Sequence, residues 1–181
     1  TSHFLSITKV DYIKINRKEK KFSSTDSLVF NEKFKDYKVP AGSMISNCKY
    51  LGFNCISNDK NFHSLEEIAL SFLNSPYLWG GKTPFGIDCS GFTQMVYKIN
   101  GYKLLRDAKD QATQGETLSF IEESEPGDLA FFHNKDDVIV HVGIILMDNH
   151  IIHASGEVRI DRLDQTGIYN NEKNTHTHYL R

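Results

Sequence analysis

The feature of this sequence that most constrains its fold is a change in the spacing of its apolar residues. From about residue 64 to residue 114 they recur at the three- and four-residue intervals of amphipathic helices. Beyond Pro126-Gly127-Asp128 they gather into short runs separated by turn residues, the pattern of β-strands joined as hairpins. Helices followed by hairpin-connected strands predict an α+β domain whose helices pack on an antiparallel sheet.

Three helices and at least four strands are expected in this domain. A capping box, Ser64-Leu65-Glu66-Glu67, begins a helix that runs to Leu73. A second helix is expected over 89–99, closed by Asn100-Gly101, and a weaker one over about 108–114. The expected strands cover Leu129–Phe132, Val138–Leu146, His150–Ala154 and Val158–Ile160, with Thr177–Leu180 as a further candidate.

Residues 1 to about 60 are predicted to form a separate, small all-β module, either a barrel or a sandwich. Short β-like runs between turn residues suggest it, over 6–15, 28–30, 37–39 and 50–56. The polar stretch Asn58-Asp59-Lys60-Asn61 is the expected boundary, which leaves residues 61–181 for the second domain.

Composition limits the partners that the chain can bind. Its 181 residues carry 21 basic and 23 acidic side chains, and a net charge of -2 does not predict the basic surface of a nucleic-acid-binding protein. No apolar run approaches the roughly 20 residues of a membrane span. The chain starts at Thr1 without a signal segment, so we expect a mature or trimmed chain whose native N-terminus is missing. We expect a monomer.

The three cysteines are an odd number, which is typical of a chain with a free thiol. Cys48 and Cys55 either pair with each other or serve as separate buried residues. Cys89 stands at the start of the second predicted helix, where unpaired amides and the helix dipole favour a thiolate. It is therefore a candidate nucleophile, and a buried cysteine that packs a helix end is the alternative.

Two histidines interrupt apolar strands and are candidate partners of the thiol. His141 and His153 are 12 residues apart (153 − 141), on strands expected to form a hairpin around Met147-Asp148-Asn149. A three-residue turn pairs Gly143 with His153 and puts both imidazoles on one face, whereas a two-residue turn puts them on opposite faces. On one face, His141 would accept the proton of Cys89 and His153 would orient His141.

The remaining histidines lie in polar or terminal contexts and are given no role. Among them, His176 and His178 form an H-x-H pair, but no cysteine or carboxylate cluster nearby completes a zinc site. We therefore expect no metal and no organic cofactor, and we expect chelators to leave the chemistry unchanged.

Five motifs of the second domain resemble the NlpC family of cell-wall cysteine peptidases. They are Tyr77-Leu78-Trp79-Gly80-Gly81, Asp88-Cys89-Ser90-Gly91, Pro126-Gly127-Asp128-Leu129, His141-Val142-Gly143-Ile144 and Ile152-His153-Ala154-Ser155. The resemblance implies a papain-like α+β fold with Cys89, His141 and His153 as the triad. It also implies hydrolysis of the γ-D-glutamyl bond to diaminopimelate or lysine in peptidoglycan stem peptides or freed muropeptides. Arg106-Asp107-Ala108 followed by Gln111 resembles the dipeptidyl-peptidase subgroup.

The resemblance assigns further residues to the site. Tyr77 corresponds to a tyrosine that assists the oxyanion or the triad, while Asp88 and Ser90 help to hold the free amine of an N-terminal L-Ala. From the residues alone, Asp88 can equally be a helix N-cap. Residues 1–60 resemble in outline a bacterial SH3-like barrel, which in the family can restrict the cleft to peptides with that free amine. Such an enzyme is expected in the cell envelope, with cytoplasmic recycling as the alternative.

Two other functions stay open. Relatives that share the papain-like core carry out acyl transfer or lipid amidohydrolysis, but the circularly permuted ones place the histidine before the cysteine, unlike Cys89 and His141 here. A non-catalytic wall-binding module is the second alternative, and the presence of all three triad residues argues against it.

Overall fold

The computed structural model describes residues 7–9, 13–14, 27–31, 34–46, 48, 54–56 and 64–180 of the chain. Its elements, in chain order, are β1 (Ile7–Lys9), β2 (Ile13–Lys14), β3 (Ser27–Asn31), β4 (Phe34–Val39), β5 (Asn54–Ile56), α1 (Leu65–Leu70), β6 (Lys82–Thr83), β7 (Gly86–Ile87), α2 (Cys89–Ile99), β8 (Tyr102–Lys103), α3 (Ala108–Gln111), β9 (Glu116–Thr117), the 3-10 turn η1 (Ile121–Glu123), β10 (Leu129–His133), β11 (Ile139–Leu146), β12 (His150–Ser155), β13 (Glu157–Leu163), β14 (Gly167–Asn170) and β15 (Thr175–Tyr179). No helix among these residues is long and apolar enough to cross a membrane.

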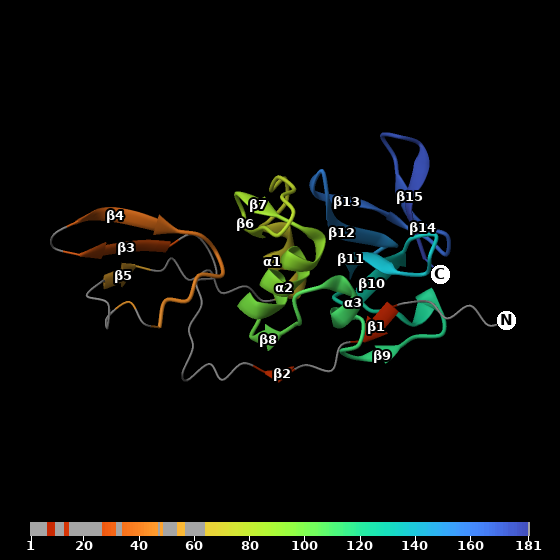
Figure 1. The fold of residues 1–181 in the computed structure, drawn as a ribbon, viewed down its shortest axis with the longest axis horizontal. Helices are drawn as coiled ribbons and strands as arrows, with labels where there is room; N and C mark the ends of the chain where they lie inside the picture. Colours follow the sequence, from red (N-terminus) through yellow and green to blue (C-terminus); the bar gives the residue numbers. More distant parts are fainter. Residues whose placement is uncertain are drawn as a thin grey trace.

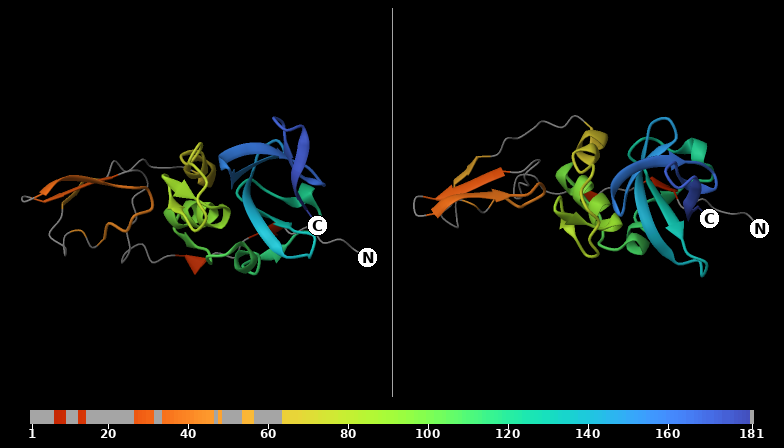
Figure 2. Two further views of the ribbon diagram at one scale, coloured as in Figure 1. Left: turned by 45° about the horizontal axis from the view of Figure 1, so that its top comes forward. Right: turned by 90° about the horizontal axis from the view of Figure 1, so that it is seen from above.

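The C-terminal strands form an antiparallel barrel with helices on its outside. Each strand from β10 to β15 pairs with the next one along the chain, and β15 returns to pair with β10, which closes the sheet. The short strands β1 and β9 extend this sheet beyond β10. Helix α2 packs on β11 and β12, and α1 packs on α2 (Figures 1 and 2). The predicted arrangement of helices on an antiparallel sheet is thus confirmed.

The helices begin where the sequence predicts. Ser64 caps α1 by accepting a hydrogen bond from the Glu67 amide at 3.2 Å, and α2 has the predicted bounds. By contrast, α1 ends at Leu70 and α3 ends at Gln111, each three residues before the predicted end. In both places the chain continues in turns in which a backbone amide donates to the carbonyl three residues earlier. This tighter 3-10 geometry is common at the ends of helices.

Two strands of the barrel, β13 and β14, differ most from the prediction, and β15 covers Thr175–Tyr179 instead of the expected Thr177–Leu180. Strand β13 extends to Leu163, beyond the predicted end at Ile160, because it pairs along its length with β12 and then with β14. No strand is predicted over β14, a four-residue segment that carries turn-forming residues, Gly167 and Asn170, at its ends. Its pairing with β13 and β15 makes it a strand.

Strand alternation divides the buried side chains between two apolar cores. The first core lies between the helices and the sheet and includes Phe72, Phe92, Val96, Phe131, Val142 and Ile152. The second lies on the opposite face, inside the barrel, and includes Phe132, Ile145, Ile151, Leu163 and Ile168. Since His141 and His153 alternate with Val142 and Ile152 along their strands, both imidazoles face the inside of the barrel.

The described parts of residues 1–60 pair in two ways. Strands β3, β4 and β5 form an antiparallel sheet of their own, whereas β1 and β2 pair with strands of the second domain. The segment after β4 reaches α2, since Ala41 belongs to the first core and Lys98 donates to the Gly42 carbonyl at 2.9 Å. The predicted boundary at 58–61 lies outside the described residues, and the division at residue 60 and the SH3-like barrel stay predictions.

Gly143 has no room for a side chain, which yields a first prediction. A Cβ at this position would lie 2.7 Å from Ile151 Cδ1 and 2.9 Å from His153 Cβ. We expect Gly143→Ala to lower the free energy of unfolding by about 1–3 kcal/mol, because the added methyl must displace buried neighbours. Urea denaturation measures this change. An unfolding midpoint equal to that of the wild type would show that the neighbouring side chains give way without cost.

Candidate active site

Cys89 is the first residue of α2, held there by the loop that precedes the helix. The Asp88 carboxylate accepts hydrogen bonds from the amide of Gly91 at 2.6 Å and from that of Gly80 at 2.8 Å, which ties the loop to the helix start. The backbone amides of Val142, Ser90 and Cys89 itself act on the sulfur and lower its pKa. The sulfur therefore lies beside the strand residue that follows His141.

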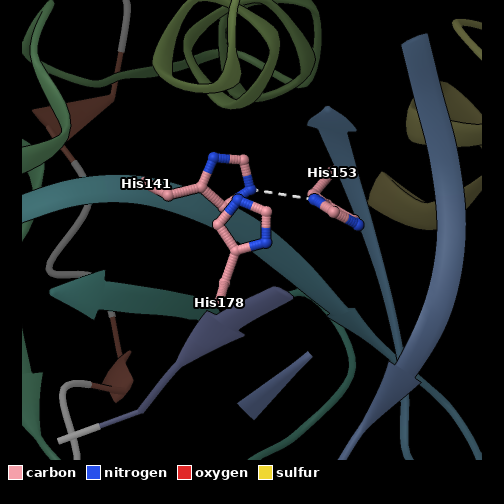
Figure 3. Close-up of side chains that lie close together, drawn as sticks. All are labelled: His141, His153 and His178. Atoms are coloured by element: carbon pink, nitrogen blue, oxygen red, sulfur yellow. Dashed lines mark hydrogen bonds between the residues drawn. The ribbon is translucent and has the colours of Figure 1, made fainter. Parts of the chain in front are cut away.

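Behind the thiol, a chain of buried side chains runs into the barrel. His141 Nε2 lies 2.8 Å from His153 Nδ1 (Figure 3), and His153 Nε2 lies 3.1 Å from Asp161 Oδ2. The Arg159 guanidinium closes the chain, because its Nε donates to Asp161 Oδ2 at 2.9 Å and its Nη2 to Oδ1 at 3.2 Å. His141, His153 and Asp161 are 6%, 1% and 3% exposed.

These contacts determine which imidazole nitrogens carry protons. The Asp161 carboxylate can only accept, so His153 donates from Nε2 and its Nδ1 is an acceptor. His141 must then donate from Nε2, which leaves its Nδ1 without a proton. The Asp161 carboxylate thus determines, through His153, which nitrogen of His141 carries the proton.

The strand register explains how these groups meet. Leu146 pairs with His150 and Gly143 with His153, so the three-residue turn predicted from the sequence is confirmed. His141 is two residues from Gly143 and therefore the diagonal neighbour of His153 on the same face. The next hairpin places Asp161 in the same way: Arg159 pairs with His153, and Asp161 is two residues from Arg159 and therefore the diagonal neighbour of His153. Asp161 is not among the candidate residues found in the sequence.

His178 also lies in this cluster, although its sequence context gives it no role. Its ring stacks on that of His141 with centroids 4.0 Å apart and planes at 23° (Figure 3). The ligand nitrogens of His141, His153 and His178 all lie within 4.8 Å of one another. His176, by contrast, turns away and bonds Asp164 at 2.9 Å, so the H-x-H pair is divided between two environments.

Burial opposes the charged forms of both Cys89 and His141. Burial raises the pKa of Cys89, and the nearby Asp88 carboxylate raises it further. The three backbone amides lower this pKa, but by less than the other two effects raise it. Burial also lowers the pKa of His141 well below its ordinary value, with His178 and His153 adding to the shift. Desolvation thus opposes the thiolate that the helix start favours.

The residues that flank the thiol form a second polar cluster. Arg106 donates to Asp88 Oδ2 at 2.6 Å and to Oδ1 at 3.1 Å, and also to Ser90 Oγ at 2.8 Å. Burial raises the pKa of Asp88, but the bonds from Arg106, Gly91 and Gly80 outweigh it and hold this pKa below its usual range. The buried Gln111 fixes the cluster from behind by donating to the Ser90 carbonyl at 2.9 Å.

The thiol opens onto a cleft of about 540 Å³. The side chains around it are Tyr77, Trp79, Asp88, Cys89, Ser90, Arg106, Asp107, Ala108, Lys109, Ile139 and Val140. The cleft thus brings together the candidates at the nucleophile, Tyr77, Asp88 and Ser90, while His141 and His153 stand behind its wall. Burial raises the pKa of the Tyr77 hydroxyl, and Cys89 and Asp88 raise it further, so Tyr77 remains a donor. Cys48, the other cysteine whose side chain is described, is a free thiol.

Comparison with known proteins places this site in a family context. The pattern of the NlpC/P60 family matches residues 74–177. The chain is 42% identical over 85 residues to the γ-D-glutamyl-L-lysine dipeptidyl-peptidase of Bacillus subtilis, covering 46% of this chain and 28% of that protein. It is 38% identical over 104 residues to dipeptidyl-peptidase 6 of Lysinibacillus sphaericus, covering 55% of this chain and 35% of that one. The chain therefore spans about a third of the length of these curated relatives.

A solved structure shares the fold. The crystal structure of an NlpC/P60 family protein from Bacillus cereus superposes with a TM-score of 0.65 at 25% identity. The superposition covers 82% of this chain and 60% of that chain.

Burial of the thiol yields a second prediction. We expect iodoacetamide to alkylate Cys89 with a pH midpoint above about 8.5, the ordinary thiol value, because burial and the Asp88 carboxylate both oppose the thiolate. Mass spectrometry of the peptide that contains Cys89, against that of Cys48 as an internal reference, measures the midpoint. A midpoint near or below neutral pH would indicate a resting thiolate–imidazolium pair instead.

Proposed function

This chain belongs to the NlpC/P60 family, and from that membership we propose that it is a cysteine peptidase acting on peptidoglycan stem peptides or muropeptides. The observation that carries the proposal is the hydrogen-bonded series His141–His153–Asp161 behind a thiol that opens onto a cleft. A free thiol, a base with an available nitrogen and a group that orients the base are the parts that nucleophilic acyl transfer needs.

In the first half of the reaction, the proton of Cys89 Sγ passes to His141 Nδ1 as the sulfur attacks the carbonyl carbon. The imidazolium that forms is stabilised through His153 by the Asp161 carboxylate. Because burial opposes charge on both the thiol and the imidazole, the proposed mechanism separates the charge as the substrate reacts. The same proton then goes to the nitrogen of the departing amine, which leaves a thioester on Cys89.

In the second half, water replaces the amine. His141 Nδ1 accepts a proton from the water as its oxygen attacks the thioester, and the sulfur leaves and recovers the proton. In both halves a negative charge develops on the carbonyl oxygen, and the Tyr77 hydroxyl is the donor that we assign to it. Its raised pKa supports this role, because the hydroxyl stays protonated at neutral pH.

The bond that we propose is the one between γ-D-glutamate and a diamino acid. A relative that matches the chain is named γ-D-glutamyl-L-lysine dipeptidyl-peptidase, and the Arg106–Gln111 stretch of the cleft resembles that subgroup. Lysine and diaminopimelate both remain candidate diamino acids. The cell envelope is the proposed location of the enzyme, and recycling of freed muropeptides in the cytoplasm is the alternative.

Recognition of a free N-terminal amine is the finer part of the proposal. Asp88 and Ser90 face the cleft, as an amine site requires, but Asp88 already accepts five hydrogen bonds, from Arg106 twice, from two amides and from the Ser90 hydroxyl at 3.4 Å. A carboxylate offers about four acceptor positions. An ammonium group must therefore replace one of these donors, and Arg106, whose side chain is 35% exposed, is the donor able to move.

Product analysis tests the proposed bond. Incubated with L-Ala-γ-D-Glu-L-Lys or the diaminopimelate analogue, the protein should release L-Ala-γ-D-Glu and the free diamino acid, as identified by mass spectrometry. The Cys89→Ala protein should release neither. The N-acetylated tripeptides should be poor substrates if the amine is recognised, and intact cross-linked sacculi should be cut far more slowly. Cleavage by the Cys89→Ala protein, or of another bond, would contradict the proposal.

Asp161 allows the role of the buried chain to be tested. We expect Asp161→Asn to lower kcat by about 10- to 100-fold with little change in KM, because the base loses its fixed tautomer while the cleft stays intact. Asp164→Asn is the matched control, because this exposed carboxylate bonds His176, which has no part in the series His141–His153–Asp161. Steady-state kinetics measures both proteins. Equal losses in the two variants, or a loss confined to KM, would remove Asp161 from the mechanism.

A further inference from the structure

His178 has no part in the hydrolysis just described, yet it lies against the base. We propose that His141, His153 and His178 form a binding site for Zn²⁺, and that its occupation switches the peptidase off. The effect on the rate rests on the proposed function, whereas the binding of the metal does not.

Three strands of the barrel bring the three rings together. His141 comes from β11, His153 from β12 and His178 from β15, which reaches them because the sheet closes through β10 (Figure 3). The His178 ring stacks on His141 and stands edge-on to His153, with centroids 5.6 Å apart at 82°. Phe132, 6.0 Å from the His178 ring, packs beside it, so this histidine is held in place rather than free at the surface.

The donor set fits zinc. Imidazole nitrogen is a preferred ligand of Zn²⁺, and three histidines with a fourth position left to water make a well-known coordination sphere. With bonds of 2.0–2.1 Å, neighbouring nitrogens of a tetrahedral site lie about 3.3 Å apart. The 2.8 Å between His141 Nε2 and His153 Nδ1 must therefore widen by roughly 0.5 Å. His178 lies within the 4.8 Å limit of the cluster, but its ring stacks on that of His141 at 23° and must turn to point a nitrogen at the metal.

Asp161 supplies the second requirement of a metal-binding histidine. The ring nitrogen that faces away from a metal normally donates to a carboxylate or carbonyl, which fixes the ring and increases its basicity. His153 Nε2 already meets Asp161 Oδ2 at 3.1 Å, so Nδ1 presents its lone pair toward the other two rings. The residues that orient the catalytic base thus also prepare a ligand.

Occupation of the site would block the base through its tautomer. Zinc on His141 Nε2 needs the lone pair there, so the proton between the two histidines must leave that nitrogen. A neutral imidazole carries one N–H, and the proton therefore moves to Nδ1, the nitrogen that accepts the thiol proton in the proposed mechanism. His141 then donates where it had accepted, and it can no longer take the proton of the thiol. The zinc takes no part in the hydrolysis; it acts only by changing which nitrogen of His141 carries the proton.

Zinc held between Cys89 and His141 is the competing arrangement, and the two differ in the residues that they need. The cluster proposed here uses Nε2 of His141 and requires His178 but not the thiol. The competing arrangement uses the opposite ring nitrogen, Nδ1, and requires the thiol but not His178. Substitutions at the two positions therefore separate them.

Calorimetric titration of the full chain with ZnCl₂ is the first experiment. The Cys89→Ala protein should bind about one Zn²⁺ per chain, and adding His178→Gln should weaken the binding at least roughly tenfold. Adding His176→Gln instead should leave it unchanged, because that histidine bonds Asp164 away from the cluster. Binding that disappears with Cys89→Ala alone, or that is insensitive to His178→Gln, would overturn the proposal.

A second measurement does not depend on the His178 substitution. Co²⁺ bound to the Cys89→Ala protein should show the intense visible absorption of a tetrahedral site without a thiolate charge-transfer band, and Zn²⁺ should displace it. The weak absorption of hexaaqua Co²⁺ would contradict the site.

Inhibition completes the test. Each protein is compared with its own EDTA-treated rate, and zinc should inhibit the wild type and His176→Gln at concentrations at least roughly tenfold below those needed for His178→Gln. Equal inhibition of the three would overturn the switch. If the wild type hydrolyses no stem peptide at all, the proposed function fails, while the calorimetry still decides the metal site.

Discussion

The buried carboxylate of Asp161 is the group on which the geometry of the site depends. A charge that is 3% exposed persists in a barrel only where donors surround it, and His153, Arg159 and Asn170 supply them. Burial raises the pKa of this carboxyl, but the bonds from His153 and Arg159 outweigh it and keep the pKa below its usual range. With the charge in place, His153 has one possible tautomer, and His141 then has one as well.

The two faces of strands β11 and β12 position different parts of the site. One face of β11 and β12 packs in the apolar core under α2 and so fixes the first residue of that helix, Cys89. The opposite face carries His141 and His153 into the barrel, beside Ile145 and Ile151. Since adjacent residues of a strand point to opposite faces, His141 points into the barrel, while the backbone amide of the next residue, Val142, acts on the Cys89 sulfur.

Much of this site can be predicted from the sequence, and its limits follow from the range of the contacts. The helix at Cys89 and the hairpin that joins His141 to His153 depend on local spacing, and both are confirmed. The same register step applied to the next hairpin would have reached Asp161, an acid two residues from the partner of His153. His178 is different, because it meets His141 only through the closure of β15 on β10, and no local pattern indicates which strands close a barrel. The hydrogen bond from Arg106 to Asp88 also joins residues far apart in the sequence, so local spacing does not indicate it.

The central claim is that Asp161, acting through His153, leaves Nδ1 of His141 as the free base nitrogen. The most direct measurement is ¹⁵N NMR of the histidine side chains in the Cys89→Ala protein at neutral pH, with assignment through single His→Gln substitutions. We expect His141 and His153 to be neutral and to carry their proton on Nε2. In Asp161→Asn protein, His153 should lose this single-tautomer signature. A proton on Nδ1 of His141, or an imidazolium at either position in the parent protein, would contradict the account.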